Sequence, residues 1–268
     1  MTLRVVNGQT VTSEKVTRNT SKTFAQMVRR VQWANVVNLY RAFEGTLHPS
    51  FESRPRSWSD FNAFMSANIG QFGVYLTASE ASQGGCLVAP YQITRGSLPS
   101  VGMGTTEAGV ITSDIKVGAL DITDETTLAA LSAAVRANNS GWEYGDQLSA
   151  YVALQKVNTI TQVPYVEVHA YEITLAEDDE TLVLDLIDND PTCFAVVDQK
   201  LCLNAPINGG ACYVHSRKDG QKTRVSTQRF TATNDLLDAY TTEAKRTEAI
   251  ISYGGKTSTE FLTPNLGN

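Results

Sequence analysis

The sequence contains no apolar run of about 18 residues or more, which is the length that a membrane-spanning helix needs. Its first ten residues, Met1–Thr10, also lack the apolar stretch of a secretory signal. These two absences predict a protein that has no signal peptide, does not contact a membrane and stays in the cell that makes it.

Sequence signatures of common enzymes are missing as well. There is no G-x-S-x-G, no phosphate-binding P-loop, no glycine fingerprint for a dinucleotide and no H-E-x-x-H zinc motif. Histidine, the usual acid–base group near neutral pH, occurs only three times. We therefore predict no catalytic residues and no enzyme activity.

Two of the histidines still allow a functional interpretation. His169 lies inside an expected strand, where the alternatives are a general base and a structural residue. His215 lies beside Ser216 and three residues after Cys212, and either of these is a candidate nucleophile. Because adjacent strand residues point to opposite faces, His215 and Ser216 would not meet directly. Structural positions are the favoured interpretation for both histidines.

Cysteine is scarce, with four in the chain and no C-x-x-C pair. Without export, free buried thiols are the expectation. Cys202, Cys212 and His215 do not fit the ligand spacing of a zinc site. The acidic stretch 185–190 lacks the glycine and glutamate of an EF-hand calcium loop. We predict neither a metal nor another cofactor.

The residues that are abundant are typical of a folded protein rich in strands and turns. Apolar residues make up 42% of the chain, enough for a core, and charged residues only 19%, which argues against disorder. Thr, Ser, Asn and Gly are frequent. The formal net charge of −6 disfavours nucleic-acid binding by the whole surface and leaves a local basic patch as the alternative.

The first 70 residues predict a ribbon followed by two helices. Asn7-Gly8 between two short apolar runs is a hairpin signal. Residues 21–43 and 57–66 each place apolar side chains at helical spacing. The expected N-caps are Thr20 or Ser21 for the first helix and Ser57 for the second.

The remaining chain alternates between strand and turn patterns, with two more helices. Long strands are expected at 147–157 and 163–175, and helices at 124–137 and 234–250. Residues 96–109 have the composition of a surface loop. Shorter strand patterns occur at 73–76, 86–89, 110–122, 182–187, 193–197, 201–203, 211–215 and 223–230. Closely spaced short strands of this kind are typical of an antiparallel β-sandwich.

These patterns predict a β-rich α+β fold, in which an N-terminal ribbon and helical segment precedes an antiparallel sandwich region with a C-terminal helix. We divide the chain into three regions. These are a basic N-terminal region of ribbon and two helices (1–70), a mixed α/β region (71–175) and a sandwich-like region with the C-terminal helix (176–268).

Basic residues gather in the N-terminal region, although the whole chain is acidic. We select the basic and aromatic side chains on and just before the first expected helix as a candidate interface. Its members are Arg18, Lys22, Arg29, Arg30, Trp33, Tyr40 and Arg41. Two partners remain open for this surface. The favoured partner is an acidic protein surface, and the alternative is a nucleic acid, for which Arg54 and Arg56 are further basic contacts.

Several of these segments resemble a known family. Residues 20–26 (TSKTFAQ), the following Arg29-Arg30 and residues 58–68 (WSDFNAFMSAN) are similar to an uncharacterised family of gut Bacteroidetes and their phages, including the crAss-like group. Residues 138–146 (NNSGWEYGD), 215–217 (HSR) and 225–228 (VSTQ) share the resemblance. It implies β-rich, immunoglobulin-like C-terminal parts, no known enzyme activity and no active-site residues to transfer.

We therefore expect a non-enzymatic structural or interaction protein. The missing export signal favours a bacteriophage virion component, assembled in the host cytoplasm, over an exported adhesin of similar composition. A tail, connector-ring or capsid-associated subunit would act through oligomeric contacts with other virion proteins and with copies of itself. The alternatives are a cell-surface binding or adhesin module and a nucleic-acid-binding protein that uses the basic N-terminal helix.

Overall fold

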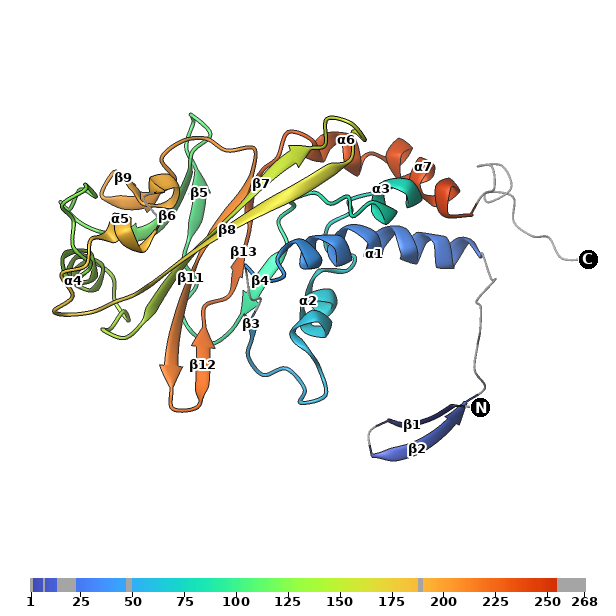
Figure 1. The fold of residues 1–268 in the computed structure, drawn as a ribbon, viewed down its shortest axis with the longest axis horizontal. Coiled ribbons are helices and arrows are strands. Elements are labelled where there is room, and N and C mark those ends of the chain that lie inside the picture. Colours follow the sequence, from blue (N-terminus) through green and yellow to red (C-terminus); the bar gives the residue numbers. More distant parts are fainter. Residues whose placement is uncertain (1, 7, 14–22, 47–49, 188–189, 255–268) are drawn as a thin grey trace, which may run out of the picture.

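The computed structural model describes residues 2–6, 8–13, 23–46, 50–187 and 190–254. This part of the chain has a β-rich α+β fold with seven α-helices, built on a central antiparallel sheet of strand order β12-β11-β7-β8 (Figure 1). A fifth strand, β14, pairs with the beginning of β11. The five strands are β7 (Gln147–Val157), β8 (Pro164–Thr174), β11 (Gly209–Asp219), β12 (Lys222–Val225) and β14 (Thr231–Thr233).

Side chains of the central sheet alternate between two hydrophobic cores. In β7, Tyr151 and Ala153 contribute to one core, whereas Leu148, Ala150 and Val152 contribute to the other. Successive strand side chains point to opposite faces, so a sheet that carries a core on each side must be covered on both faces. The covering layers are a group of helices on one face and a smaller sheet with a helix on the other.

Helices from both ends of the described chain form the first layer. Helix α1 contacts α2, α3 and α7, and residues of α1 and α2 share a core with β7, β8 and β11 (Figure 1). The helices are α1 (Phe24–Ala42), α2 (Asp60–Asn68), α3 (Ala78–Ser82), α6 (Leu237–Thr241) and α7 (Glu243–Gly254). At the end of the layer, Met27 and Val31 of α1 pack with Ala249 and Ile250 of α7.

Side-chain caps start α1 and α2 later than the sequence pattern predicts. Thr23 and Gln26 form a reciprocal capping box at the start of α1. Ser59 accepts a hydrogen bond from the Asn62 N–H and starts α2, so the predicted cap Ser57 is wrong. The other predicted caps, Thr20 and Ser21, lie outside the described residues.

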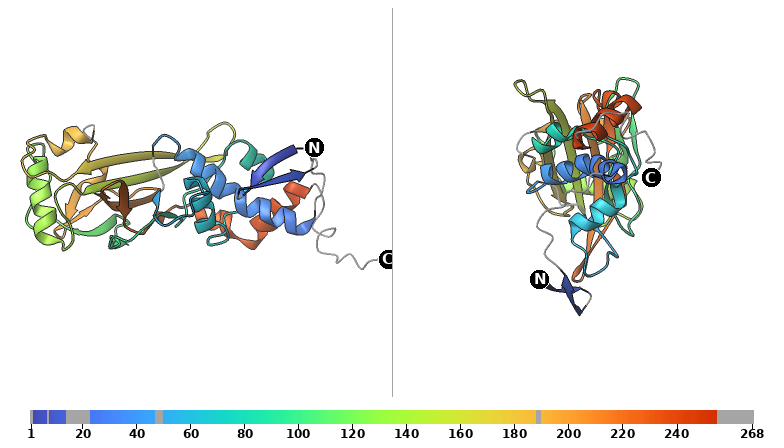
Figure 2. Two further views of the ribbon diagram at one scale, coloured as in Figure 1. Left: turned by 90° about the horizontal axis from the view of Figure 1, so that it is seen from below. Right: turned by 90° about the vertical axis from the view of Figure 1, so that its right-hand side faces the viewer.

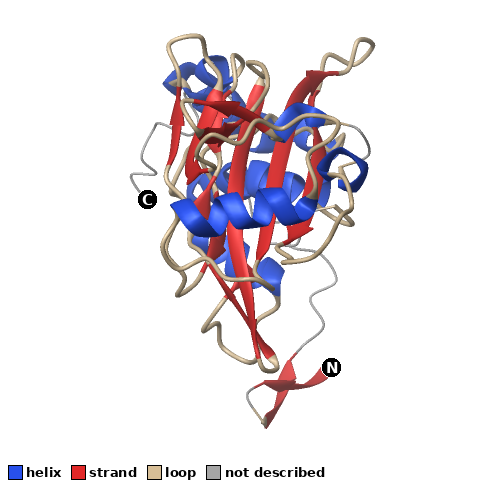
Figure 3. Ribbon diagram, turned by 90° about the vertical axis from the view of Figure 1, so that its left-hand side faces the viewer, coloured by secondary structure: helices blue, strands red, loops and turns tan. Residues whose placement is uncertain are grey.

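The second layer covers the opposite face of the central sheet. It contains a smaller antiparallel sheet of order β5-β6-β10-β9, together with α4, α5 and a 3-10 turn, η1. The molecule is elongated, with α4 at one end and α1 and α7 at the other (Figure 2). Viewed from the α4 end, this helix lies across the ends of the strands (Figure 3). The elements are β5 (Met103–Thr105), β6 (Ile111–Lys116), α4 (Leu128–Asn138), α5 (Val183–Leu186), η1 (Pro191–Cys193), β9 (Ala195–Val197) and β10 (Lys200–Cys202).

A three-stranded sheet of order β13-β4-β3 lies beside the helical layer, and its β3–β4 pair is parallel. Its strands are β3 (Ser50–Phe51), β4 (Gln92–Arg95) and β13 (Gln228–Arg229). The predicted strand at 86–89, just before β4, is wrong. There the side-chain amide of Asn35 forms hydrogen bonds with both the N–H and the carbonyl group of Leu87. These bonds take the place of those that a neighbouring strand would make.

Four other sequence predictions are wrong. Residues 73–76 form no strand, and the predicted surface loop 96–109 contains β5. Residues 182–187 form α5 instead of a strand, after Thr127 and Leu182 form an isolated bridge. The expected single helix 234–250 is two helices, because Thr242 is extended and its hydroxyl accepts a hydrogen bond from Lys245 N–H.

The N-terminal ribbon is confirmed as a hairpin of β1 (Thr2–Val6) and β2 (Gln9–Ser13). Gly8 in its turn has a φ of +79°, a conformation that glycine adopts without strain. The two strands pair with each other and with no other described strand. The hairpin lies apart from the rest of the described chain (Figures 1 and 3).

The predicted fold class is confirmed as mixed α+β and β-rich, with antiparallel sheets and a C-terminal helix. The immunoglobulin-like form of the sandwich stays a prediction. Within the described ranges, the helices are too short or too polar to cross a membrane.

Candidate interaction surface

The seven residues of the predicted interface do not all lie on one surface. Arg29, Arg30 and Trp33 lie on the outer side of α1, where they line one hollow. Arg41 is exposed in the last turn of the helix. The remaining two basic residues, Arg18 and Lys22, lie outside the described residues.

Tyr40 packs inward, against the aromatic side chains of α2. Its ring lies 5.1 Å from that of Phe61 in an edge-to-face arrangement and 5.4 Å from that of Phe64. Burial, with a smaller contribution from Asp60, raises the pKa of the Tyr40 hydroxyl. In this structure Tyr40 therefore joins α1 to α2 and does not face a partner.

The hollow on α1, called here the α1 groove, has a volume of about 390 Å³. Its lining includes the apolar side chains of Val37 and Ala81, together with Arg29, Arg30 and Tyr253. Trp33 is the most prominent apolar group, with 46% of its surface exposed. An exposed tryptophan between apolar side chains, rimmed by arginines, has the composition of a protein–protein contact.

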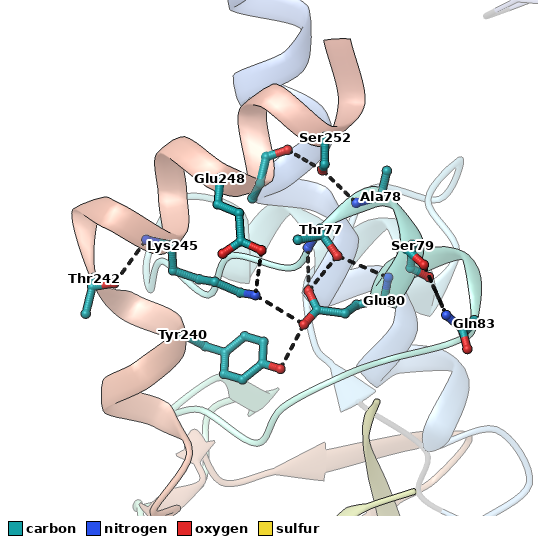
Figure 4. Close-up of polar contacts among 11 residues, drawn as sticks. Thr77, Ala78, Ser79, Glu80, Gln83, Tyr240, Thr242, Lys245, Glu248 and Ser252 are labelled. Carbon is teal, nitrogen blue, oxygen red and sulfur yellow. Dashed lines mark hydrogen bonds and ion pairs between the residues drawn. The ribbon is translucent and has the colours of Figure 1, made fainter. Parts of the chain in front are cut away.

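A partly buried acidic residue, Glu80, positions two helices that border the α1 groove. Glu80 of α3 accepts hydrogen bonds from the Thr77 N–H at 2.7 Å, the Tyr240 hydroxyl at 2.9 Å and the Lys245 ammonium group at 3.2 Å (Figure 4). Burial alone would raise the pKa of Glu80, but these hydrogen bonds and the charge of Lys245 outweigh burial and lower it. The Glu80 carboxylate therefore fixes α3 to the C-terminal helices.

A second contact joins α3 and α7 near the same groove. The hydroxyl of Ser252 accepts a hydrogen bond from the Ala78 N–H at 2.8 Å (Figure 4). This bond satisfies a free N–H at the start of α3 with a side chain of α7, 174 residues away. Ala81 and Tyr253, which belong to the bonded helices, thus enter the groove from fixed positions.

The candidate catalytic histidine, His215, lies in a buried cluster at the end of the central sheet. Its Nε2 is 2.7 Å from Oδ2 of Asp146, and its ring stacks on Trp142 at 3.9 Å. Arg217 donates two hydrogen bonds to Asp146, from Nε at 2.6 Å and from Nη2 at 2.7 Å. Burial lowers the pKa of His215, although the adjacent Asp146 carboxylate opposes this shift.

The proposed nucleophiles do not meet His215. Cys212 and Ser216 lie on the strand face opposite to His215, and Cys212 packs in the core with the helical layer. The Ser216 hydroxyl donates to Gln147 at 3.3 Å. The other candidate base, His169, is partly exposed and contacts Glu167 at 3.1 Å. The cluster joins the loop of Trp142 to β11, because His215 stacks on Trp142 and Arg217 donates to the Gly141 carbonyl oxygen.

The four cysteines are buried and free, as predicted. Burial raises the pKa of the Cys86 thiol to about 12, which is unfavourable for the thiolate needed in catalysis or metal binding. In the described part of the chain, His, Cys, Asp and Glu form no group of three that could hold a metal ion.

Sequence reasoning missed the far wall of the α1 groove and the residues that hold it. No sequence pattern marks Ala81 and Tyr253 as groove residues. The groove lies between helices that are distant in the chain, so it depends on tertiary packing. Thr77 and Glu80 have the Thr-x-x-Glu spacing of a capping box and were a usable signal for α3.

Comparisons of the chain with protein-family models, curated proteins and solved structures gave no match.

Proposed function

We propose that the protein is a non-enzymatic structural component of a bacteriophage virion, namely a tail, connector-ring or capsid-associated subunit that works through contacts between copies and with other virion proteins. The observation that carries this proposal is the detached β1–β2 hairpin. Leu3 is 70% exposed and Val5 is 71% exposed, so the described structure leaves the apolar face of this hairpin uncovered.

The register of the hairpin places its two most exposed apolar side chains, Leu3 and Val5, on one face. Leu3 is opposite Thr12, and Val5 is opposite Thr10, so these four residues share one face. A two-stranded hairpin alone is only marginally stable in water. An arm with this face gains stability when a partner covers it, and a neighbouring subunit is such a partner.

The α1 groove is the surface that we propose for the arm of a neighbouring copy. It offers Trp33, Val37 and Ala81 as apolar contacts of the kind that Leu3 and Val5 need. The hairpin lies away from α1, α3 and α7 of its own chain (Figure 1), and these helices carry the groove residues. Exchange of arms between copies gives heterologous contacts, which close into a ring when the rotation between subunits allows it.

Three further features support a non-enzymatic role. His215 is enclosed in a bonded cluster, the cysteines are buried, and the described His, Cys, Asp and Glu residues do not converge on a metal site. The resemblance to proteins of gut Bacteroidetes and their phages supports the virion as the location. An immunoglobulin-like arrangement of the sheet region belongs to the same proposal.

The proposal is tested by following the chain in a culture that produces phage. We expect it to band with particles in a density gradient and to be detected by mass spectrometry of washed particles. A chain found on intact cells in uninfected cultures would instead identify the rival function, a cell-surface binding module. A chain found only free in the cytoplasm would contradict both.

A further inference from the structure

A second hollow, of about 710 Å³, lies between the segment that joins β3 to α2 and the β11–β12 hairpin. Both segments project on the same side of the molecule (Figure 1). We call it the basic hollow, because four cationic side chains, two carboxylates and three hydroxyl groups line it. The cationic residues are Arg54, Arg56, Lys222 and Arg224.

The two carboxylates are already engaged. Glu52 accepts a hydrogen bond from the Val225 N–H, and this bond together with others to Ser97 lowers the pKa of Glu52 against the opposing effect of burial. Asp60 forms an ion pair with Arg54 at 3.1 Å. The acidic groups therefore hold the walls together and leave a net positive charge in the hollow.

The cations differ in how far they are engaged. Arg54 pairs with Asp60 and donates to the Trp58 carbonyl oxygen, whereas Arg224 uses only its Nε, which donates to Ser97 at 2.9 Å. The side chains of Arg56 and Lys222 are exposed and form neither a hydrogen bond nor an ion pair with any residue that the structure describes. Three cationic groups, from two segments about 170 residues apart in the sequence, therefore face the hollow with unused donors.

This set of groups fits the oxygens of a phosphate. Arginine presents a fork of N–H donors that fits phosphate oxygens, and hydroxyl groups such as those of Ser53 and Thr223 are common phosphate donors. Trp58 is 38% exposed beside the hollow, with its backbone held by Arg54. A basic groove next to an exposed aromatic ring is the arrangement on which single-stranded nucleic acids bind.

We propose that the basic hollow binds the phosphates of a single-stranded nucleic acid, with Arg56, Lys222 and Arg224 as the phosphate contacts and Trp58 as a stacking surface for a base. This site is independent of the β1–β2 hairpin. It also differs from the basic face of α1, because Arg29 and Arg30 lie at the α1 groove.

The test is fluorescence anisotropy of a labelled oligothymidylate with the full chain, titrated at low salt and at several salt concentrations. The Arg56→Glu/Lys222→Glu variant is expected to bind at least tenfold more weakly. Loss of two phosphate contacts from a single strand lowers the slope of log affinity against log salt by about 1.4. Trp58→Ala is expected to weaken binding about fivefold or more.

The matched control is Lys116→Glu/Arg136→Glu, which makes the same charge change at two exposed basic residues of β6 and α4 and is expected to keep wild-type affinity. The milder Arg56→Gln/Lys222→Gln variant is expected to bind more weakly while keeping the wild-type thermal midpoint. Such a result shows that the loss of affinity is not caused by misfolding. Three results would overturn the proposal. These are no binding by the wild type, loss of binding in the control with retention in the basic-hollow variant, and equally strong competition by poly-glutamate, which would identify an acidic protein as the partner.

Discussion

The side-chain amide of Asn35 pairs with the backbone of Leu87 as a neighbouring strand would. It accepts a hydrogen bond from the Leu87 N–H at 2.7 Å and donates to the Leu87 carbonyl oxygen at 3.0 Å. Asn68 makes the same two-point contact with Gln92, at 2.7 and 2.9 Å. Side-chain amides of α1 and α2 thus satisfy the backbone N–H and carbonyl groups of Leu87 and Gln92, which lie in the buried segment between the helices and the sheet.

Replacing Asn35 by leucine should therefore destabilise the fold strongly. The substitution keeps the side chain buried but leaves one N–H and one carbonyl group of Leu87 without partners, at a cost of about 2–4 kcal/mol. We expect a lower urea midpoint with an unchanged slope. Gln32→Leu, an exposed change on the same helix, is the control and should shift stability by less than about 0.5 kcal/mol. Equal effects of both substitutions would refute the role of this pair.

The amide contacts also explain where sequence reasoning failed. Residues 86–89 (CLVA) have the composition of a buried strand, and periodicity cannot reveal that their partners are side chains distant in the sequence. In contrast, β7 was predicted with its observed bounds, because a long apolar pattern between turns is a local signal. The hairpin turn at Gly8 was predicted for the same reason.

The Glu80 carboxylate should stabilise the C-terminal helices against local opening. Glu80→Gln keeps the cap of α3 but loses the charge-assisted contact with Lys245, and we expect a loss of about 1–2 kcal/mol. Amide hydrogen exchange should become faster in α7 and stay unchanged in β7. Glu248→Gln removes only an exposed contact to the same lysine and is the control. Uniform acceleration across the molecule would argue against a local role for Glu80.

The His215 cluster predicts how stability depends on pH. The folded-state pKa of His215 is lowered, so the unfolded chain takes up this proton first as the pH falls. Its contribution to stability is therefore complete above about pH 6.5 and is lost as the pH falls through the lowered folded-state value. Asp146 and Glu80 also have lowered pKa values. Their contributions to stability are lost at lower pH, below about pH 4.

The expected result is a thermal midpoint that declines in two steps on acidification. His215→Gln should remove the first step, whereas His169→Gln, a change at a partly exposed histidine, should retain it. Differential scanning fluorimetry between about pH 8 and pH 3.5 covers both windows. A first step that persists in His215→Gln would show that another group causes it.

Asp146 should matter far more than the exposed carboxylate beside it. Its side chain is 1% exposed and contacts both His215 and Arg217, so Asp146→Asn should cost about 3 kcal/mol. Glu143, which is exposed and also contacts Arg217, is the matched control, and Glu143→Gln should cost less than about 1 kcal/mol. Chemical denaturation at neutral pH measures both, and similar losses would contradict the account.

Only part of the candidate interface could be predicted from the sequence. Arg29, Arg30 and Trp33 were found because basic and aromatic residues on one helix are visible as a pattern. In the sequence, Tyr40 resembles Trp33 as an aromatic residue of the same helix. In the structure it packs on Phe61, and this contact depends on how α1 and α2 cross, which the sequence pattern does not show. The basic hollow joins Arg56 to Lys222, and no local pattern connects residues so far apart.

Assembly through the β1–β2 hairpin is the central claim, and light scattering of the purified chain over a range of concentrations tests it directly. We predict a discrete multimer for the wild type and a monomer for Leu3→Asp/Val5→Asp. Ile160→Asp, at an exposed apolar side chain of another hairpin, should leave the multimer intact. A monomeric wild type at every concentration, or a multimer that survives the Leu3→Asp/Val5→Asp change, would contradict the central claim.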